Sequence, residues 1–269
     1  MTLVLTLRER PEQRLDCSPL VPHLLAAKSA AQIEAIELQT TRVRVTVGDA
    51  FRLRMGDPAH IRVEGGCDRL DQVGAGMTGG EIEVFGDVGI QAGRLMTGGR
   101  LTIRGNAEHW AASGMKNGVI EIAGSAGDRL GGPLAGEVAG MRGGIVIVRG
   151  SAGARAGDKL RRGTIVIEGS AGDHAGSRMI AGTLIVRGAA GALPGYLMNR
   201  GNIVLGEAAS LSPTFADCGV HELVAMRLLA NFVKPHSKAA ASLLIRPMQR
   251  LAGDTAVSGH GELFLGNSA

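Results

Sequence analysis

Neighbouring aspartate, glutamate and histidine residues are the first places in this sequence where acid–base chemistry could occur. The dipeptide Asp173-His174 lies in a glycine-rich connection, and His221-Glu222 opens a segment with helical spacing. General acid–base catalysis needs acids and bases that converge on one site. Four aspartates of the glycine-rich region do not occupy one equivalent position: Asp87, Asp128, Asp158 and Asp173. We therefore expect a surface pair at residues 173–174, a helix start at residues 221–222, and no catalytic residue.

Metal-ligating and nucleophilic side chains are scattered as well. The seven histidines and three cysteines show none of the CxxC, HxH or HExxH spacings that bring ligands together. Cys17, Cys67 and Cys218 are few, odd in number and far apart, which is typical of a reducing compartment rather than a disulfide framework. His109 precedes Trp110, the single tryptophan, which we expect to pack at a corner of the fold. The sequence thus predicts neither a metal site nor a cysteine nucleophile.

One segment, Gly74–Gly79, matches the GxGxxG pattern of dinucleotide-binding proteins. In a chain with 42 glycines such a match is expected by chance. It also precedes a strand, whereas the dinucleotide fingerprint follows a strand and opens a helix. The phosphate-binding pattern GxxxxGK[ST] does not occur. We therefore expect no cofactor-binding residue on this chain.

Charge and composition narrow the class of protein further. The 269 residues carry 29 basic and 25 acidic side chains, a net charge of +4, with both signs interleaved. Nucleic-acid binders usually combine a clustered basic stripe with stacking aromatics, and this chain has one Trp, one Tyr and five Phe. The chain shows neither a signal-peptide pattern nor an apolar run of membrane-spanning length. We therefore expect a cytoplasmic protein that binds neither nucleic acid nor membrane.

A strict internal repeat is the main feature of the sequence. Segments of the type G-x-[ILV]-x-[IVL]-x-G, the last one residue shorter, recur at spacings of 19, 19, 26, 19, 19 and 19 residues, where 26 is 19 + 7. They begin at Gly80, Gly99, Gly118, Gly144, Gly163, Gly182 and Gly201. A weaker copy spans Ala59–Gly65. Such a period predicts about eight stacked repeats between residues 59 and 206.

Each repeat holds one strand with alternating apolar residues and a return too short for a helix, which predicts an all-β solenoid. In-register stacking places equivalent residues over one another in inward-facing columns. The first column is Ile82, Leu101, Ile120, Val146, Ile165, Leu184 and Ile203, and the second is Val84, Ile103, Ile122, Val148, Ile167, Val186 and Leu205. The third is Met77, Met96, Met115, Met141, Leu160, Met179 and Met198.

The segments on either side of the repeats are expected to cap the two ends of the solenoid. In residues 1–58 we expect strands at 2–7, 42–47 and 51–54 and a short helix after Ser29. Residues 59–208 are expected to form the solenoid, and residues 209–269 a helical tail. In the tail, residues 221–232 have helical spacing, and a second helix is expected before Pro247.

The outward position at the middle of each strand indicates a covered surface. It is polar in the first three repeats and apolar in the last four, at Ile147, Val166, Ile185 and Val204. An exposed apolar stripe of this depth would be an aggregation hazard, so something must cover it. Either the helix at 221–232 packs on it or a partner subunit does. The seven-residue insertion Gly131–Glu137 is either a docking loop or a tolerated surface loop.

The unit GxxGxxxGxxMxxGxIxVxG resembles the GXGXG β-helix that the C-terminal domain of glutamate synthase shares with the family of the C subunit of formylmethanofuran dehydrogenase. The runs LTLRERPEQRLDCSPLVPHLL and IELQTTRVRVTVGDAFRLRMGD are similar to the start of that C subunit. A related C subunit belongs to the formyltransferase/hydrolase complex of methylotrophic bacteria, which fits the Ala/Arg/Gly-rich composition. The resemblance covers nearly the whole chain. It implies a right-handed parallel β-helix with about eight coils of 19 residues.

The resemblance also implies a role in one-carbon (formaldehyde) oxidation. Complexes of this kind transfer the formyl group of formyl-tetrahydromethanopterin to methanofuran or an analogue and hydrolyse it to formate. The partners would be a formyltransferase subunit, an amidohydrolase-like subunit with a catalytic metal and one further subunit. These partners would hold the carriers, and the C subunit would be a non-catalytic scaffold. Two alternatives stay open: the C subunit of a molybdenum or tungsten formylmethanofuran dehydrogenase, or an independent β-helix enzyme or binding protein.

Overall fold

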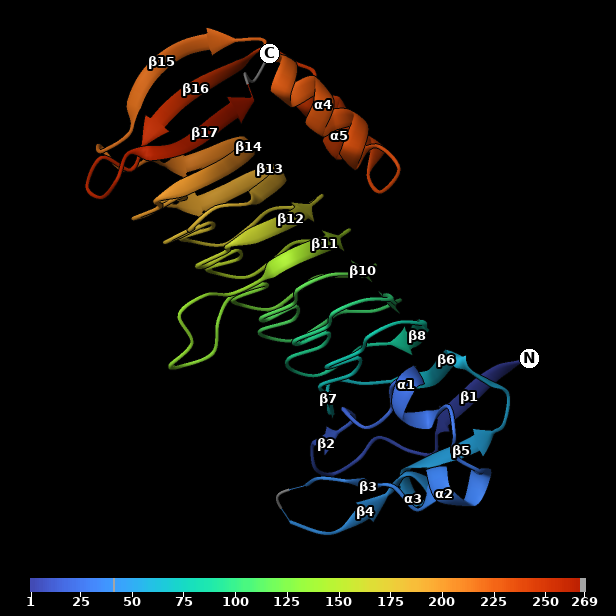
Figure 1. Cartoon of the computed structure of the whole chain (residues 1–269). Helices are drawn as coiled ribbons and strands as arrows, with labels where there is room; N and C mark the ends of the chain where they lie inside the picture. The colour runs from blue at the N-terminus through green and yellow to red at the C-terminus, as the bar shows by residue number, and fades with distance from the viewer. Residues whose placement is uncertain (41, 267–269) are drawn as a thin grey trace.

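The computed structural model describes residues 1–40 and 42–266 and shows a mainly β protein with few helices. One sheet of 13 strands dominates, in the order β15-β16-β17-β14-β13-β12-β11-β10-β9-β8-β6-β1-β5. Within this sheet, antiparallel pairs occur only at the two ends. The strands lie side by side along one elongated stack that runs from the N-terminal to the C-terminal end of the chain (Figure 1).

The parallel strands of the repeat region lie in the sheet in the same order as in the chain. They are β6 (Asp57–Gly66), β8 (Glu81–Gly86), β9 (Arg100–Ile103), β10 (Val119–Ile122), β11 (Arg142–Val148), β12 (Arg162–Ile167), β13 (Thr183–Ala192) and β14 (Arg200–Ser210). Ile82 pairs with Leu101, and Leu101 pairs with Ile120. The 26-residue spacing does not change the strand register, since Ile120 pairs with Val146. The predicted stacking of equivalent residues is confirmed in these strands.

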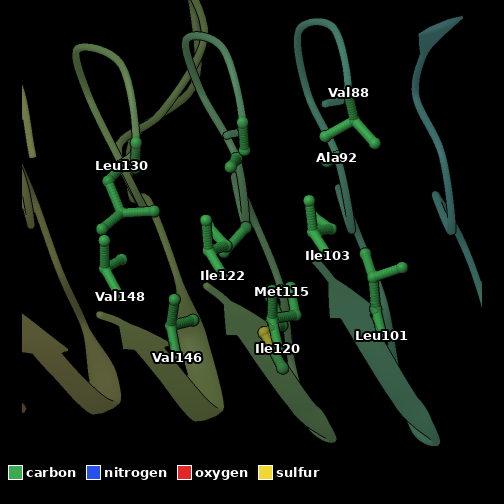
Figure 2. Close-up of a cluster of buried hydrophobic side chains, with 14 of the residues drawn as sticks. Val88, Ala92, Leu101, Ile103, Met115, Ile120, Ile122, Leu130, Val146 and Val148 are labelled. Carbon is green, nitrogen blue, oxygen red and sulfur yellow. The ribbon is translucent and has the colours of Figure 1, made fainter. Parts of the chain in front are cut away.

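The inward-facing columns form the main core. Ile82 is 1% exposed, and the six other residues of the first column are fully buried, as is the whole methionine column. Leu101, Ile103, Ile120, Ile122, Val146 and Val148 point into one interior together with Met115 and Leu130 (Figure 2). The connections between strands stack too, through parallel bridges that join Val88, Ala107, Ala126, Ala152, Ala171 and Ala190. Unbranched Met fills the irregular space where strand and connection meet.

Glycine is required where one repeat passes directly over the next. Gly118 has a φ of +101°, a backbone conformation that side chains with a β-carbon rarely adopt. A β-carbon there would lie 2.7 Å from the carbonyl oxygen of Gly99 and 2.7 Å from Cε of Met96. Both contacts are closer than van der Waals packing permits, so the glycine that opens this strand has a steric cause.

The N-terminal end extends the sheet by two strands. β1 (Thr2–Leu7) lies parallel to β6 and antiparallel to β5 (Phe51–Arg54). The other elements here are α1 (Pro22–Leu25), β2 (Leu15–Asp16), which pairs with β7 (Leu70–Asp71), and β3 (Glu37–Leu38), which pairs with β4 (Val45–Thr46).

Two short helices complete the N-terminal end. Ser29 caps α2 (Ala30–Glu34) as predicted, in a reciprocal capping box with Gln32. The strand expected over residues 42–47 is shortened to β4, because Thr46 caps the unpredicted helix α3 (Val47–Ala50).

The C-terminal segment corrects one expectation. Residues 209–269, expected as a helical tail, contain α4 (Val224–Val233) and α5 (Lys238–Leu244) but also the strands β15 (Ala216–His221), β16 (Met248–Gly253) and β17 (His260–Gly266). β17 pairs in parallel with β14, so Leu263 lies opposite Ile203. The segment GELFLG at 261–266 has the same apolar spacing as GNIVLG at 201–206, but it lies outside the 19-residue period. Across the described residues, no helix is long and apolar enough to cross a membrane.

Candidate functional site

The outward column of the repeat strands is the candidate interaction site. Its polar half, at Glu83, Thr102 and Glu121, is partly exposed. Its apolar half is covered: Ile147 and Val166 are 1% exposed, and Ile185 and Val204 are fully buried. Phe264 of β17 lies opposite Val204 and lengthens the apolar half by one residue, which sequence reasoning missed.

Helices α4 and α5 of the chain itself lie on this apolar half (Figure 1). Val166, Ile185 and Val204 belong to a second hydrophobic cluster, separate from the main core. Its helical members are Met226, Ala230, Val233, Ala240, Ala241, Leu243 and Leu244. The α4 members recur at a helical period, which gives that helix one apolar face for the sheet. Three of the four candidate interface residues are thus contacts within the chain; Ile147 is buried beside them but outside the cluster.

The opposite side of α4 is apolar and exposed. Val224, Leu228 and Phe232 follow one another at four-residue spacing and keep 69%, 65% and 51% of their surface accessible. Residues four apart lie on one side of a helix, so these three form a single stripe. Helix α4 therefore covers an apolar face of the sheet and itself exposes an apolar stripe on its outer side.

A polar network borders the covered face. Arg149 donates to Glu121 at 2.7 Å and to Glu168 at 2.6 Å, and Ser237 donates its hydroxyl to the same Glu168 at 2.6 Å. Partial burial opposes the charge on Arg149, but its hydrogen bonds to Glu121 and Glu168 raise the pKa of its guanidinium. Ser237 is also the N-cap of α5, because its oxygen accepts the amide of Ala240 at 3.0 Å. One side chain therefore joins the helix start to the sheet.

Replacing Ser237 with alanine is expected to lower the free energy of unfolding by about 1–2 kcal/mol, since it removes both the cap and the bond to Glu168. Chemical denaturation of the purified chain measures this. Ser242→Ala is the matched control, because among the described residues that exposed hydroxyl bonds only the carbonyl oxygen of Ala239. The control should stay within about 0.5 kcal/mol of the parent. Equal effects at the two serines would contradict the role of Ser237 as the anchor.

The aspartates that could carry chemistry bind the backbone instead. Asp128 and Asp173 share one position of the repeat, with Ala154 between them, because both follow the bridged alanines by two residues. The seven-residue insertion hides this equivalence in the sequence. Asp128 accepts the amide of Ala154 at 2.8 Å, and Asp173 accepts that of Ala192 at 2.7 Å. Each carboxylate therefore ties one repeat to the next.

Asp158 and Cys17 are buried, whereas the other two cysteines are more accessible. Asp158 is fully buried and accepts hydrogen bonds from Ser177 at 3.0 Å and from Arg178 at 2.9 Å. Cys17 is buried, and burial raises the pKa of its thiol well above the usual range, so it stays protonated at neutral pH. Cys67 is partly buried and Cys218 exposed.

The histidines lie apart from one another. His109 accepts the amide of Asp128 at 2.9 Å, and the neighbouring Trp110 is partly buried at a corner with its ring edge-on to His109. His174 packs edge-on against Tyr196. His221 precedes α4 rather than opening it, since the helix begins at Val224. Within the described part of the chain, no group of three His, Cys, Asp or Glu side chains is placed to hold a metal ion.

The insertion Gly131–Glu137 protrudes from the stack as a loop (Figure 1). It is anchored by an ion pair of 2.6 Å between Arg94 and Glu137, and Glu137 also accepts the amide of Leu134 at 2.9 Å. Val138, directly after it, is 72% exposed. The loop is thus fixed at its base and presents an apolar side chain.

Asp254 is a structural residue that sequence reasoning missed. It is fully buried before β17 and accepts the amides of Leu197 and Ala256, both at 2.9 Å. Burial opposes its ionisation, but hydrogen bonds from Thr214 and these two amides hold the pKa of the carboxyl below its ordinary value. A single aspartate far from the repeat in sequence gives no motif by which it could be found.

Replacing Asp254 with asparagine is expected to lower the free energy of unfolding at pH 7 by about 1–2 kcal/mol. A lowered pKa in the folded state gives stability that is present above the unfolded pKa of about 3.9 and is lost as the pH falls through the folded pKa. The gap between parent and variant should therefore narrow below about pH 4. Urea unfolding at pH 7, 5 and 3 measures it, and a gap independent of pH would contradict this account.

Comparison with known proteins gives two matches over nearly the whole chain and a partial third. The C subunit of the formyltransferase/hydrolase complex Fhc from Methylorubrum extorquens is 49% identical over 262 residues, 97% of this chain and 98% of that protein. A chain of the crystal structure of the formyltransferase/hydrolase complex FhcABCD from Methylorubrum extorquens with methylofuran superimposes with a TM-score of 0.95 at 41% identity, covering 97% of this chain and 98% of that one. The C subunit of the tungsten-containing formylmethanofuran dehydrogenase 2 of Methanothermobacter thermautotrophicus is 35% identical over 97 residues, 34% of this chain and 36% of that protein. No family model matches the sequence.

Proposed function

Since this chain belongs to the family of the C subunit of the formyltransferase/hydrolase complex Fhc, related to the C subunit of formylmethanofuran dehydrogenase, we propose that it is the structural, non-catalytic member of such a complex. The complex would transfer the formyl group of formyl-tetrahydromethanopterin to a methanofuran-like carrier and hydrolyse it to formate in one-carbon metabolism. The observation that carries this proposal is the match to the C subunit of Fhc over nearly the full length of both chains. The relation to the dehydrogenase spans only about a third of each chain, which makes that complex the weaker alternative.

We further propose that the stacked repeats form a right-handed parallel β-helix over residues 59–208, capped by residues 1–58 and 209–269. Its support is the parallel register of the strands together with the second set of parallel bridges between the connections. A scaffold of this kind is rigid along its axis, because every repeat is held by backbone hydrogen bonds to both neighbours.

The non-catalytic role is supported by how the reactive side chains are used. Asp128 and Asp173 hold the backbone of the next repeat, and Asp158 is held by Arg178. A general acid or base must reach a substrate, whereas Asp158 is fully buried and Asp128 and Asp173 each use one carboxylate oxygen to hold a neighbouring repeat. We therefore assign the formyltransferase and hydrolase chemistry to partner subunits. The methanofuran-like carrier, tetrahydromethanopterin and the catalytic metal are assigned there too.

Co-expression with and without this chain tests the proposal. If the chain is a scaffold, omission of it should abolish recovery of the assembled complex. The variants Asp128→Asn and Asp173→Asn, once assembled, should form formate from formyl-tetrahydromethanopterin at the rate of the parent complex. A fully assembled complex that loses turnover by about a hundredfold with either variant would contradict the non-catalytic role, since losses of this size follow removal of a catalytic acid or base.

A further inference from the structure

Basic side chains from separate repeats meet along one corner of the stack. Lys116, Arg142 and Arg161 each follow a residue of the methionine column, and their amides donate to Met96, Met115 and Met141 of the preceding repeat at 2.8, 2.7 and 2.9 Å. Arg162 follows in the chain and pairs in register with Arg142. Stacked strands lie about 4.8 Å apart, so these four residues form one block of positive charge. We call Lys116, Arg142, Arg161 and Arg162 the basic corner.

The basic corner has no counter-charge of its own. All four residues are exposed, and within the described chain none of their side chains takes part in an ion pair or a hydrogen bond. In the same part of the stack, Arg149 is paired with both Glu121 and Glu168. Like charges that stack in register destabilise a sheet. Such an arrangement is therefore explained best by negative charge supplied from another molecule.

The surroundings of the corner favour a protein over a nucleic acid. Arginine binds carboxylates through paired N–H donors, which suits a surface rich in Asp and Glu. Single-stranded nucleic acid is usually held by stacking on aromatic rings, and no aromatic residue adjoins a member of the basic corner in the sequence. The anchored insertion and the exposed Val138 lie just before Arg142 in the chain, so an apolar contact adjoins the charged one. An apolar centre beside a charged rim is typical of protein interfaces.

We infer that the basic corner docks against an acidic surface of a partner subunit, an inference that rests on the proposed scaffold function. Attraction between opposite charges accelerates encounter of the subunits and fixes their relative orientation. Salt screens such contacts, so assembly through this corner should weaken as the ionic strength rises.

Charge reversal in the co-expressed complex tests this inference. The variant R142E/R161E/R162E should keep the unfolding temperature of the parent chain while its affinity for the other subunits falls on the order of a hundredfold, as for lost interfacial charge pairs. The matched control R42E/R52E/R54E changes the same charge at three exposed arginines of the N-terminal end and should assemble within about threefold of the parent. If the triple glutamate variant does not fold, R142Q/R161Q/R162Q replaces it and should show the same direction of loss.

The possible outcomes separate this inference from the proposed function. Parent-like assembly of the variant would overturn the docking surface and leave the scaffold function standing. A parent chain that assembles with no other subunit would overturn both. A variant that assembles normally but loses binding to a single-stranded DNA oligonucleotide would overturn the protein partner in favour of a nucleic acid.

Discussion

Replacing Gly118 with alanine is expected to lower the free energy of unfolding by about 2–5 kcal/mol, or to prevent folding. Two effects add: the left-handed backbone costs a residue with a β-carbon about 1–2 kcal/mol, and overpacking against a fixed neighbour costs about 1–3 kcal/mol. The neighbour is fixed because Gly99, whose carbonyl oxygen would lie 2.7 Å from the new carbon, belongs to the adjacent repeat. Thermal and urea unfolding of the purified chain measure the loss.

Gly76→Ala is the matched control for Gly118→Ala. Gly76 also has a positive φ, +68°, but an added β-carbon there has no heavy atom within 4 Å. Only the cost of the left-handed backbone should remain, a loss of about 1–2 kcal/mol. Equal losses at the two positions would show that the close stacking of repeats at the strand glycines is not what requires glycine.

Replacing Ile185 with aspartate is expected to lower the free energy of unfolding by at least about 4 kcal/mol, since it buries an unpaired charge in addition to removing apolar contacts. Ile185 is fully buried between the sheet and helices α4 and α5. The damage should be local at first: amide hydrogen exchange in α4 and α5 should accelerate while the interior of the repeats stays protected.

Ile185→Val keeps the apolar contact and serves as the control. It should cost only about 0.5–1.5 kcal/mol and leave exchange in the helices near that of the parent. If the aspartate variant left α4 and α5 as protected as the valine variant does, the helices would not depend on this face of the sheet.

The repeat could be predicted from the sequence because its stacking depends on local spacing alone. The strand glycines, the inward apolar pairs and the methionine column recur at 19 residues in all steps but one, so the pairing of Leu101 with Ile120 follows from counting. The strand β17 did not follow, since 60 residues separate Gly261 from Gly201. Its other neighbour in the sheet, β16, pairs with it in antiparallel fashion. Pairings between distant segments leave no periodic pattern.

The candidate site was predictable only in part. The apolar residues at 147, 166, 185 and 204 indicate that the face is covered, but apolar character does not identify the cover, and both the helix and a partner subunit fit the sequence. The structure places α4 and α5 on Val166, Ile185 and Val204. The basic corner could not be predicted from the sequence, because its residues are not close to one another in the chain. Lys116, Arg142 and Arg161 are scattered in the chain, and only the stacking of repeats brings them together.

Affinity purification of the tagged chain from its own host, with mass analysis of the accompanying proteins, tests the scaffold function most directly. The account predicts that a formyltransferase-like subunit and an amidohydrolase-like subunit accompany the chain in a fixed ratio. A chain that elutes alone as a stable monomer would contradict the scaffold function. A complex that instead contains a redox-active metallopterin subunit would contradict the assignment to a formyltransferase/hydrolase complex.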